Sequence, residues 1–86
     1  MYRLEIKKSA RKELDSLPNQ VFQKIDKAIL SLQNNPYPHP QSIKLKDDYK
    51  RRLRIGDYRV IYTVDEQLKV ITIFRVRNRK EAYRNN

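Results

Sequence analysis

The sequence contains no cysteine, and it has one histidine and one glycine among its 86 residues. One histidine without cysteine is too few for a structural metal site, so we expect no metal and no other cofactor. The lack of cysteine also excludes disulfides and is typical of a reducing compartment. We expect a single small domain, residues 1–86, whose stability depends on its apolar core.

Long hydrophobic runs are also missing. No apolar stretch approaches the roughly 20 residues that cross a bilayer, and the start of the chain, Met1–Glu5, does not resemble a signal peptide. We therefore expect a cytoplasmic protein without a membrane partner.

Acidic residues are scarce: ten Asp and Glu stand against twenty Lys and Arg, which gives a net charge of +10. Residues 1–43 carry seven basic and four acidic side chains, whereas residues 44–86 carry thirteen and six. An excess of this size attracts nucleic acid, an acidic protein or an anionic membrane. The membrane is the weakest of these, because the basic residues fall on predicted strands rather than on one amphipathic helix.

The N-terminal half predicts one strand and two helices. Residues Tyr2–Lys7 alternate between apolar and polar side chains, as a strand does. Ser9 is a plausible N-cap for a helix through Leu17, and Pro18 then interrupts the helical pattern. The stretch Asn19–Leu32 has apolar side chains at helical spacing and predicts a second helix. The proline-rich residues 36–40 predict an extended connector.

The C-terminal half has the period of two that strands show. It predicts strands at Tyr49–Arg54, Tyr58–Val64 and Lys69–Val76, followed by a short helical turn at Arg79–Arg84. The sole glycine, Gly56, lies in the first turn, where a positive φ is expected. The order β-α-α-β-β-β predicts a small α+β fold, with two helices on one face of a mainly antiparallel sheet.

Basic side chains gather on the other face of this sheet. Because alternate residues of a strand share a face, Lys50, Arg52 and Arg54 project together, and Leu53 points the opposite way. Arg59 on the next strand belongs to the same basic face. Neighbouring cations repel one another, so a polyanion such as a phosphodiester backbone is the expected ligand.

Arg51 is the exception, because it shares the face of Leu53. We expect it near a strand end, where its stem can reach water. The tyrosines Tyr49, Tyr58 and Tyr62 are expected to pack in the sheet.

Three segments together resemble the RelE/ParE toxin superfamily, and specifically its RelE branch of ribosome-dependent mRNA endoribonucleases. They are Lys44–Lys46, the hairpin Leu53–Tyr62 (LRIGDYRVIY) and the ending Val76–Arg84 (VRNRKEAYR). The resemblance covers nearly the whole chain. It implies a small α+β domain whose concave sheet face carries the active site, and an antitoxin partner that wraps and neutralises the toxin.

The resemblance also implies functional positions. The catalytic positions fall on Lys50, Arg52, Arg59, Arg79 and Tyr83. The supporting RNA-binding positions fall on Lys44, Lys46, Arg54 and Arg77. The partners implied are ribosomal RNA, mRNA and an acidic antitoxin, the last in a hetero-oligomer.

RNA can be cleaved without a metal when the 2′-hydroxyl attacks the adjacent phosphate. Such a site needs a base, an acid and cations that stabilise the extra phosphate charge. His39 is alone in the proline-rich loop and the carboxylates form no obvious pair, which leaves Lys50 and Tyr83 as candidate bases. Neighbouring positive charge favours neutral lysine and anionic tyrosine, the forms that accept a proton. Arg79 or a water would assist the leaving group, and Arg59 would clamp the phosphate bidentately.

Two alternatives remain open. The ParE branch shares the fold and the hairpin, but it inhibits DNA gyrase by binding and is not a ribonuclease. The second alternative is a toxin-derived module that binds RNA or the ribosome without cleaving RNA.

Overall fold

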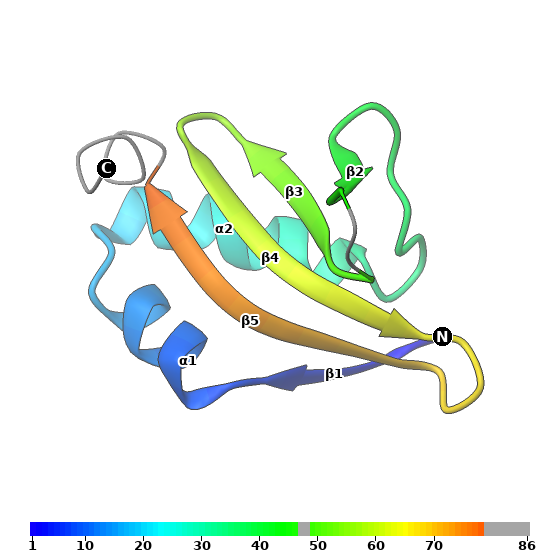
Figure 1. The fold of residues 1–86 in the computed structure, drawn as a ribbon. Coiled ribbons are helices and arrows are strands. Elements are labelled where there is room, and N and C mark those ends of the chain that lie inside the picture. Colours follow the sequence, from blue (N-terminus) through cyan, green and yellow to red (C-terminus); the bar gives the residue numbers. More distant parts are fainter. Residues whose placement is uncertain (47–48, 79–86) are drawn as a thin grey trace.

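The computed structural model describes residues 1–46 and 49–78, and these form five strands and two helices (Figure 1). The strands lie in the order β1-β5-β4-β3-β2, with β1 parallel to β5 and every other pair antiparallel. In chain order the elements are β1 (Arg3–Ile6), α1 (Lys8–Asp15), α2 (Asn19–Ser31), β2 (Ser42–Lys44), β3 (Arg51–Ile55), β4 (Tyr58–Asp65) and β5 (Val70–Asn78).

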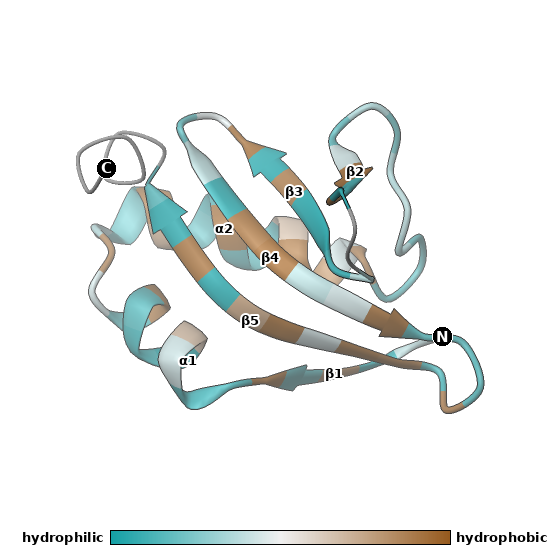
Figure 2. Ribbon diagram, in the orientation of Figure 1, coloured by the Kyte–Doolittle hydropathy of each residue, from teal (hydrophilic) through white to brown (hydrophobic). Residues whose placement is uncertain are grey.

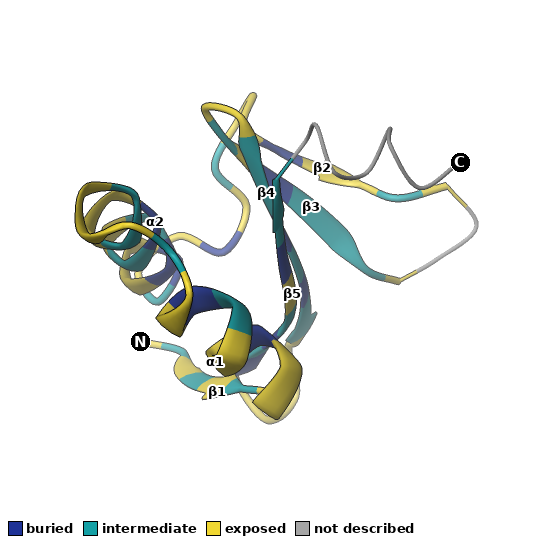
Figure 3. Cartoon of the chain, turned by 90° about the vertical axis from the view of Figure 1, so that its left-hand side faces the viewer, coloured by how far each residue is buried: buried dark blue, intermediate teal, exposed yellow. Residues whose placement is uncertain are grey.

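Both described helices lie on one face of the sheet, as Figure 3 shows from the side. α1 contacts β5 and α2 contacts β3. The apolar core fills the space between the helices and the sheet, because each helix buries one stripe and each strand buries alternate residues. The predicted α+β fold with a mainly antiparallel sheet is confirmed. Fully buried side chains include Leu14, Ile25, Ile29, Leu32, Val60, Tyr62, Ile71 and Ile73.

The predicted limits of the first helix were wrong at both ends, since Ser9 is not its N-cap and the helix ends at Asp15 rather than at Leu17. α1 begins at Lys8, with Lys7 as its N-cap and no side-chain cap. Instead of capping the helix, the Ser9 hydroxyl donates a hydrogen bond of 2.9 Å to the carbonyl oxygen of Phe74 on β5. α2 begins at Asn19, directly after Pro18, as expected.

β2 was not predicted from the sequence. It is three residues long, and its central side chain, Ile43, is 43% exposed. A strand this short, without a buried apolar residue at its centre, has no period-two signature. It exists because its backbone pairs with β3, where Ser42 lies opposite Leu53 and Ile43 opposite Arg52.

The β3–β4 hairpin follows the prediction closely, and Gly56 has a φ of +58°. A residue with a side chain is strained in this region, which explains the glycine. The expectation for Tyr49 was wrong, because it precedes β3 and is 73% exposed. Tyr62, in contrast, is fully buried.

A β-bulge interrupts the pairing of β4 with β5. Tyr62 lies opposite Ile73, but its neighbour Ile61 lies opposite Arg75, so Phe74 is an extra residue on β5. The bulge lets both Ile73 and Val76 point into the core, three positions apart. Figure 2 shows the resulting sequence of hydrophobic and hydrophilic bands along β5.

The predicted helical turn at Arg79–Arg84 lies outside the described residues. Within residues 1–46 and 49–78, no helix is long and apolar enough to span a bilayer.

Candidate nucleic-acid interface

Three arginines lie side by side across the middle of the sheet. Arg59 on β4 is directly opposite Arg54 on β3 and directly opposite Arg77 on β5. Residues opposed in this way have Cα atoms about 4.5–5.5 Å apart and project from the same face. This face is opposite to that of Leu53, Val60 and Val76, which are buried. We call Arg54, Arg59 and Arg77 the arginine row.

A second line of residues runs parallel to the arginine row. Arg52 on β3 lies opposite Ile61 on β4, and Ile61 lies opposite Arg75 on β5. Arg52 and Arg75 therefore add two cations to the same face, with an apolar side chain between them. The structure confirms the expected placement of Arg52, Arg54 and Arg59 on one face.

The charge of this face is poorly compensated. Among the residues that the structure describes, no carboxylate lies within ion-pair distance of Arg52, Arg54 or Arg59. Like charges that face one another directly across a sheet destabilise it. The arrangement is therefore suited to an anionic ligand, and guanidinium groups bind phosphate oxygens bidentately.

Lys50 precedes β3, and its ammonium group lies 5.1 Å from the centre of the Phe74 ring. Lys7 approaches the same ring, at 5.9 Å. An ammonium group over an aromatic face is attracted by the ring quadrupole, so Phe74 holds both lysine heads near the bulge of β5. Phe74 was not identified from the sequence, because its place depends on the bulge.

Arg51 lies on the core-facing side of β3, as expected, but its guanidinium does not simply reach water. It donates a 2.9 Å hydrogen bond from Nε to the Ser42 hydroxyl and lies 5.0 Å from the centre of the Tyr37 ring. Tyr62 Oη lies 2.5 Å from the same Ser42 oxygen and donates to the carbonyl of Pro36 at 2.7 Å. These contacts fasten the proline-rich connector to the sheet.

The remaining predicted site residues are not all near the arginine row. Lys44 lies opposite Arg51, which places it on the other face of the sheet. Lys46 is exposed beyond the end of β2. Arg79 and Tyr83 lie outside the described residues.

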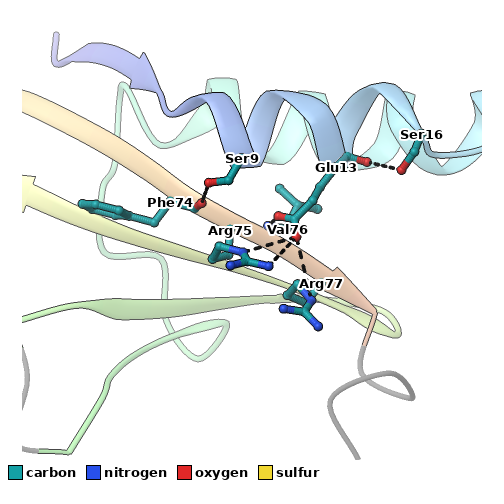
Figure 4. Close-up of polar contacts among 7 residues, drawn as sticks. All are labelled: Ser9, Glu13, Ser16, Phe74, Arg75, Val76 and Arg77. Atoms are coloured by element: carbon teal, nitrogen blue, oxygen red, sulfur yellow. Dashed lines mark hydrogen bonds and ion pairs between the residues drawn. The ribbon is translucent and has the colours of Figure 1, made fainter. Parts of the chain in front are cut away.

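Glu13 on α1 contacts the basic face, and it was not predicted from the sequence. Its carboxylate lies 2.9 Å from the Arg75 guanidinium and 3.8 Å from Arg77 Nε, and it accepts a hydrogen bond from the Val76 N–H (Figure 4). It thus neutralises part of the basic face at the β5 edge. No sequence signal distinguishes this helix carboxylate from an ordinary surface residue.

Strongly shifted pKa values occur in a different cluster. Glu66 accepts hydrogen bonds from the hydroxyls of Tyr2 and Tyr37, and these lower its pKa to about 2. Partial burial and the bond to Glu66 raise the pKa of Tyr37 to about 12. Because Glu66 follows β4 and Tyr37 lies in the connector, this cluster joins two loops.

Comparison with known proteins identifies the family. Residues 4–83 match the model of the ParE toxin of the type II toxin–antitoxin system parDE. The chain belongs to the RelE/ParE superfamily of type II toxins. It is also 35% identical to a candidate toxin of Methanocaldococcus jannaschii, RelE1, over 98% of this chain and 97% of that protein.

Solved structures of RelE toxins have the same fold as this toxin. The RelE–RelB complex of Pyrococcus horikoshii OT3 aligns with a TM-score of 0.77 and 34% identity, over 91% of this chain and 94% of that chain. The RelB–RelE antitoxin–toxin complex of Methanococcus jannaschii aligns with a TM-score of 0.72 and 25% identity, over 93% and 95% of the two chains.

Proposed function

We propose that this toxin is a ribosome-dependent endoribonuclease that cleaves mRNA codons in the ribosomal A site and so inhibits translation. The supporting observation is the arginine row on the sheet face opposite the two described helices, hereafter the open face, without a carboxylate at ion-pair distance from Arg54 or Arg59 among the described residues. Such a face suits a phosphodiester backbone, and the excess charge of +10 suits docking on ribosomal RNA.

The proposed reaction uses the RNA's own 2′-hydroxyl as nucleophile. A base removes its proton, the oxygen bonds to the adjacent phosphorus, and the bond from phosphorus to the 5′ oxygen breaks. That oxygen takes up a proton, which leaves a 2′,3′-cyclic phosphate and a 5′-hydroxyl. Arg59 lies between Arg54 and Arg77, where a phosphate would meet three guanidinium groups, so it is the proposed clamp for the charge that develops.

The proton-transfer roles are assigned to Lys50 and Tyr83, either of which is the proposed base. Lys50 lies beside this face, where Phe74 holds its ammonium group. Arg52 and Arg54 add positive charge, and Arg79 or a water is proposed to assist the leaving group. The roles of Arg79 and Tyr83 follow from the family resemblance.

The proposed partners are the ribosome, mRNA and an acidic antitoxin. Two of the similar structures are complexes of RelE with RelB, which supports an antitoxin for this chain. We propose that this antitoxin covers the basic face in a hetero-oligomer, and that the protein acts as a single domain in the cytoplasm. Association with such a partner should weaken as the salt concentration rises.

The function is tested by primer extension on an mRNA under translation in a purified system, beside the same mRNA without ribosomes. Cuts in A-site codons are expected when ribosomes are present. Arg59→Ala should reduce the cleavage rate about 100-fold or more, because it removes the proposed phosphate clamp. Arg3→Ala is the matched control, since Arg3 lies on the edge strand β1 and pairs with Glu5 at 3.6 Å.

Two outcomes would overturn the proposal or its assignment. If wild-type protein makes no cuts with ribosomes, a gyrase supercoiling assay and a ribosome-binding assay separate the ParE-like inhibitor from an inactive binding module. If Arg59→Ala, with its fold intact, cleaves at the wild-type rate, Arg59 is not the clamp.

A further inference from the structure

A second basic surface lies on helix α1, outside the open sheet face. Lys8, Arg11 and Lys12 are all exposed, and their spacing of three and four residues puts them on one side of the helix. The buried residues of α1, Ala10 and Leu14, lie on the other side. An open hollow of about 620 Å³ lies over this surface, lined by Lys8, Ser9, Arg11, Lys12 and Asp15. We call Lys8, Arg11 and Lys12 the α1 stripe.

The cations of the α1 stripe are available to a ligand. Within the described part of the chain, none of the three forms an ion pair. Asp15 borders the stripe and offsets one of its charges, whereas Glu13 is turned toward Arg75 and Val76 on β5. With three cations and one bordering carboxylate, the stripe keeps a net positive charge.

The α1 stripe is connected to the proposed catalytic face at the bulge of β5. Lys7 directly precedes α1, and its ammonium group lies 5.9 Å from the Phe74 ring, which Lys50 also approaches at 5.1 Å. Basic side chains thus continue from α1 around the β5 edge to Lys50. Figure 3 shows α1 on the same face of the sheet as α2, which is the face opposite the arginine row. A ligand that touches both the α1 stripe and the arginine row must therefore extend around the β5 edge.

The chemistry of the stripe favours RNA phosphates over a protein partner. Protein interfaces have an apolar centre that is depleted in lysine. The large hydrophobic side chains that are exposed in the described part of the chain all lie outside α1. They are Met1, Leu30, Tyr37, Ile43, Tyr49 and Leu68. Cations without an aromatic ring contact the backbone rather than the bases, as in the shape recognition of duplex RNA.

We infer that the α1 stripe binds the phosphate backbone of double-helical RNA, separately from the strand that is cleaved. The inference rests on the proposed function, from which it takes RNA as the ligand. The stripe would hold a folded RNA segment while the arginine row holds the single strand.

The test compares two doubly substituted proteins of equal charge. Lys8→Gln/Lys12→Gln removes two cations from the stripe, and Lys24→Gln/Lys27→Gln removes two exposed lysines from α2. Lysine and glutamine have similar helix propensities, so both proteins should fold. Binding to a labelled RNA duplex of about 20 base pairs is measured by fluorescence anisotropy across a salt series, without ribosomes.

The stripe variant should bind the duplex about tenfold more weakly near 100 mM salt, and its log–log salt slope should fall by about 1.8, which corresponds to two lost phosphate contacts. The α2 variant should change much less. Equal losses in the two variants would show an effect of net charge alone and overturn the inference. Unchanged duplex binding, with weaker binding of a co-expressed antitoxin, would overturn it in favour of a protein ligand.

The same experiment separates this inference from the proposed function. Duplex binding is measured without translation or cleavage, so a stripe-specific loss supports the RNA surface even if the wild-type protein cuts no mRNA. Conversely, the wild-type protein could cleave mRNA on ribosomes while the two variants lose duplex binding equally. That result would support the proposed function and overturn the inference about the α1 stripe.

Discussion

Glu13 on α1 accepts a hydrogen bond from the backbone N–H of Val76 on β5, with 2.7 Å between the carboxylate oxygen and the nitrogen. β1 pairs with β5 only as far as Ile73, so Glu13 replaces the strand neighbour that Val76 lacks. The same carboxylate pairs with Arg75. One side chain therefore protects a sheet edge and limits the free charge of the basic face.

Two substitutions separate these roles of Glu13. Glu13→Ala should lower the free energy of unfolding by about 1–3 kcal/mol, because a half-buried backbone donor loses its partner. Glu13→Gln should cost less, since the amide oxygen can still accept that bond. It should also strengthen RNA binding, because Arg75 and Arg77 lose their counter-charge. Urea unfolding and RNA anisotropy measure the two effects, with Glu5→Gln as the surface control. Equal stability losses in the two Glu13 variants would show that charge, rather than the Val76 bond, is what matters.

The arginine row should cost stability in the absence of a ligand. Arg54→Gln removes one of two cations that face each other across β3 and β4, so it should raise the free energy of unfolding by a few tenths of a kcal/mol, up to about 1 kcal/mol. Denaturation at low salt measures this gain, which should shrink as added salt screens the repulsion. The same variant should bind RNA more weakly. A loss of stability at low salt would contradict the repulsion between Arg54 and Arg59.

Tyr62 should hold the proline-rich connector through its hydroxyl. Tyr62→Phe leaves the Pro36 carbonyl and the Ser42 hydroxyl without this partner in a buried position. We expect a loss of about 1–3 kcal/mol in the free energy of unfolding, measured by urea denaturation. Tyr49→Phe, at an exposed position, is the control and should have almost no effect. Similar free energies of unfolding for the two variants would show that the hydrogen bonds of Tyr62 do not stabilise the fold.

The Glu66 cluster should make stability depend on pH at both extremes. The pKa of Glu66 is lowered to about 2 in the folded state, so its contribution is present above its unfolded pKa and is lost as the pH falls from about 5 toward 2. The pKa of Tyr37 is raised to about 12, so its contribution is present below pH 10 and is lost as the pH rises toward 12.

The free energy of urea unfolding, measured across this pH range, tests both losses of stability. We call the fall at low pH the acid limb and the fall at high pH the alkaline limb. Glu66→Gln should flatten the acid limb and weaken the alkaline limb, because Tyr37 would lose its carboxylate acceptor. Glu5→Gln should leave both limbs unchanged. An acid limb that persists in Glu66→Gln would assign it to other carboxylates.

The sequence alone determined the two helices, the hairpin and the part of the basic face that lies on β3 and β4. The apolar spacing in α2 and the alternation in β3 and β4 are local patterns, and each was sufficient to place side chains toward the core or away from it. The arrangement of Arg52, Arg54 and Arg59 followed from that alternation. The single glycine, with its positive φ, fixed the hairpin turn between Arg54 and Arg59.

The tertiary structure decided what depends on contacts between distant segments. β2 forms because its backbone pairs with β3. Ser9 and Glu13 form hydrogen bonds with the backbone of β5 because α1 packs against that strand. The bulge at Phe74 is the clearest case. A regular strand would place Arg75 and Arg77 on the buried face of Ile73, whereas the extra residue turns both toward the open face. A period-two pattern cannot reveal this shift, because the bulge is set by how β4 and β5 pair across the core.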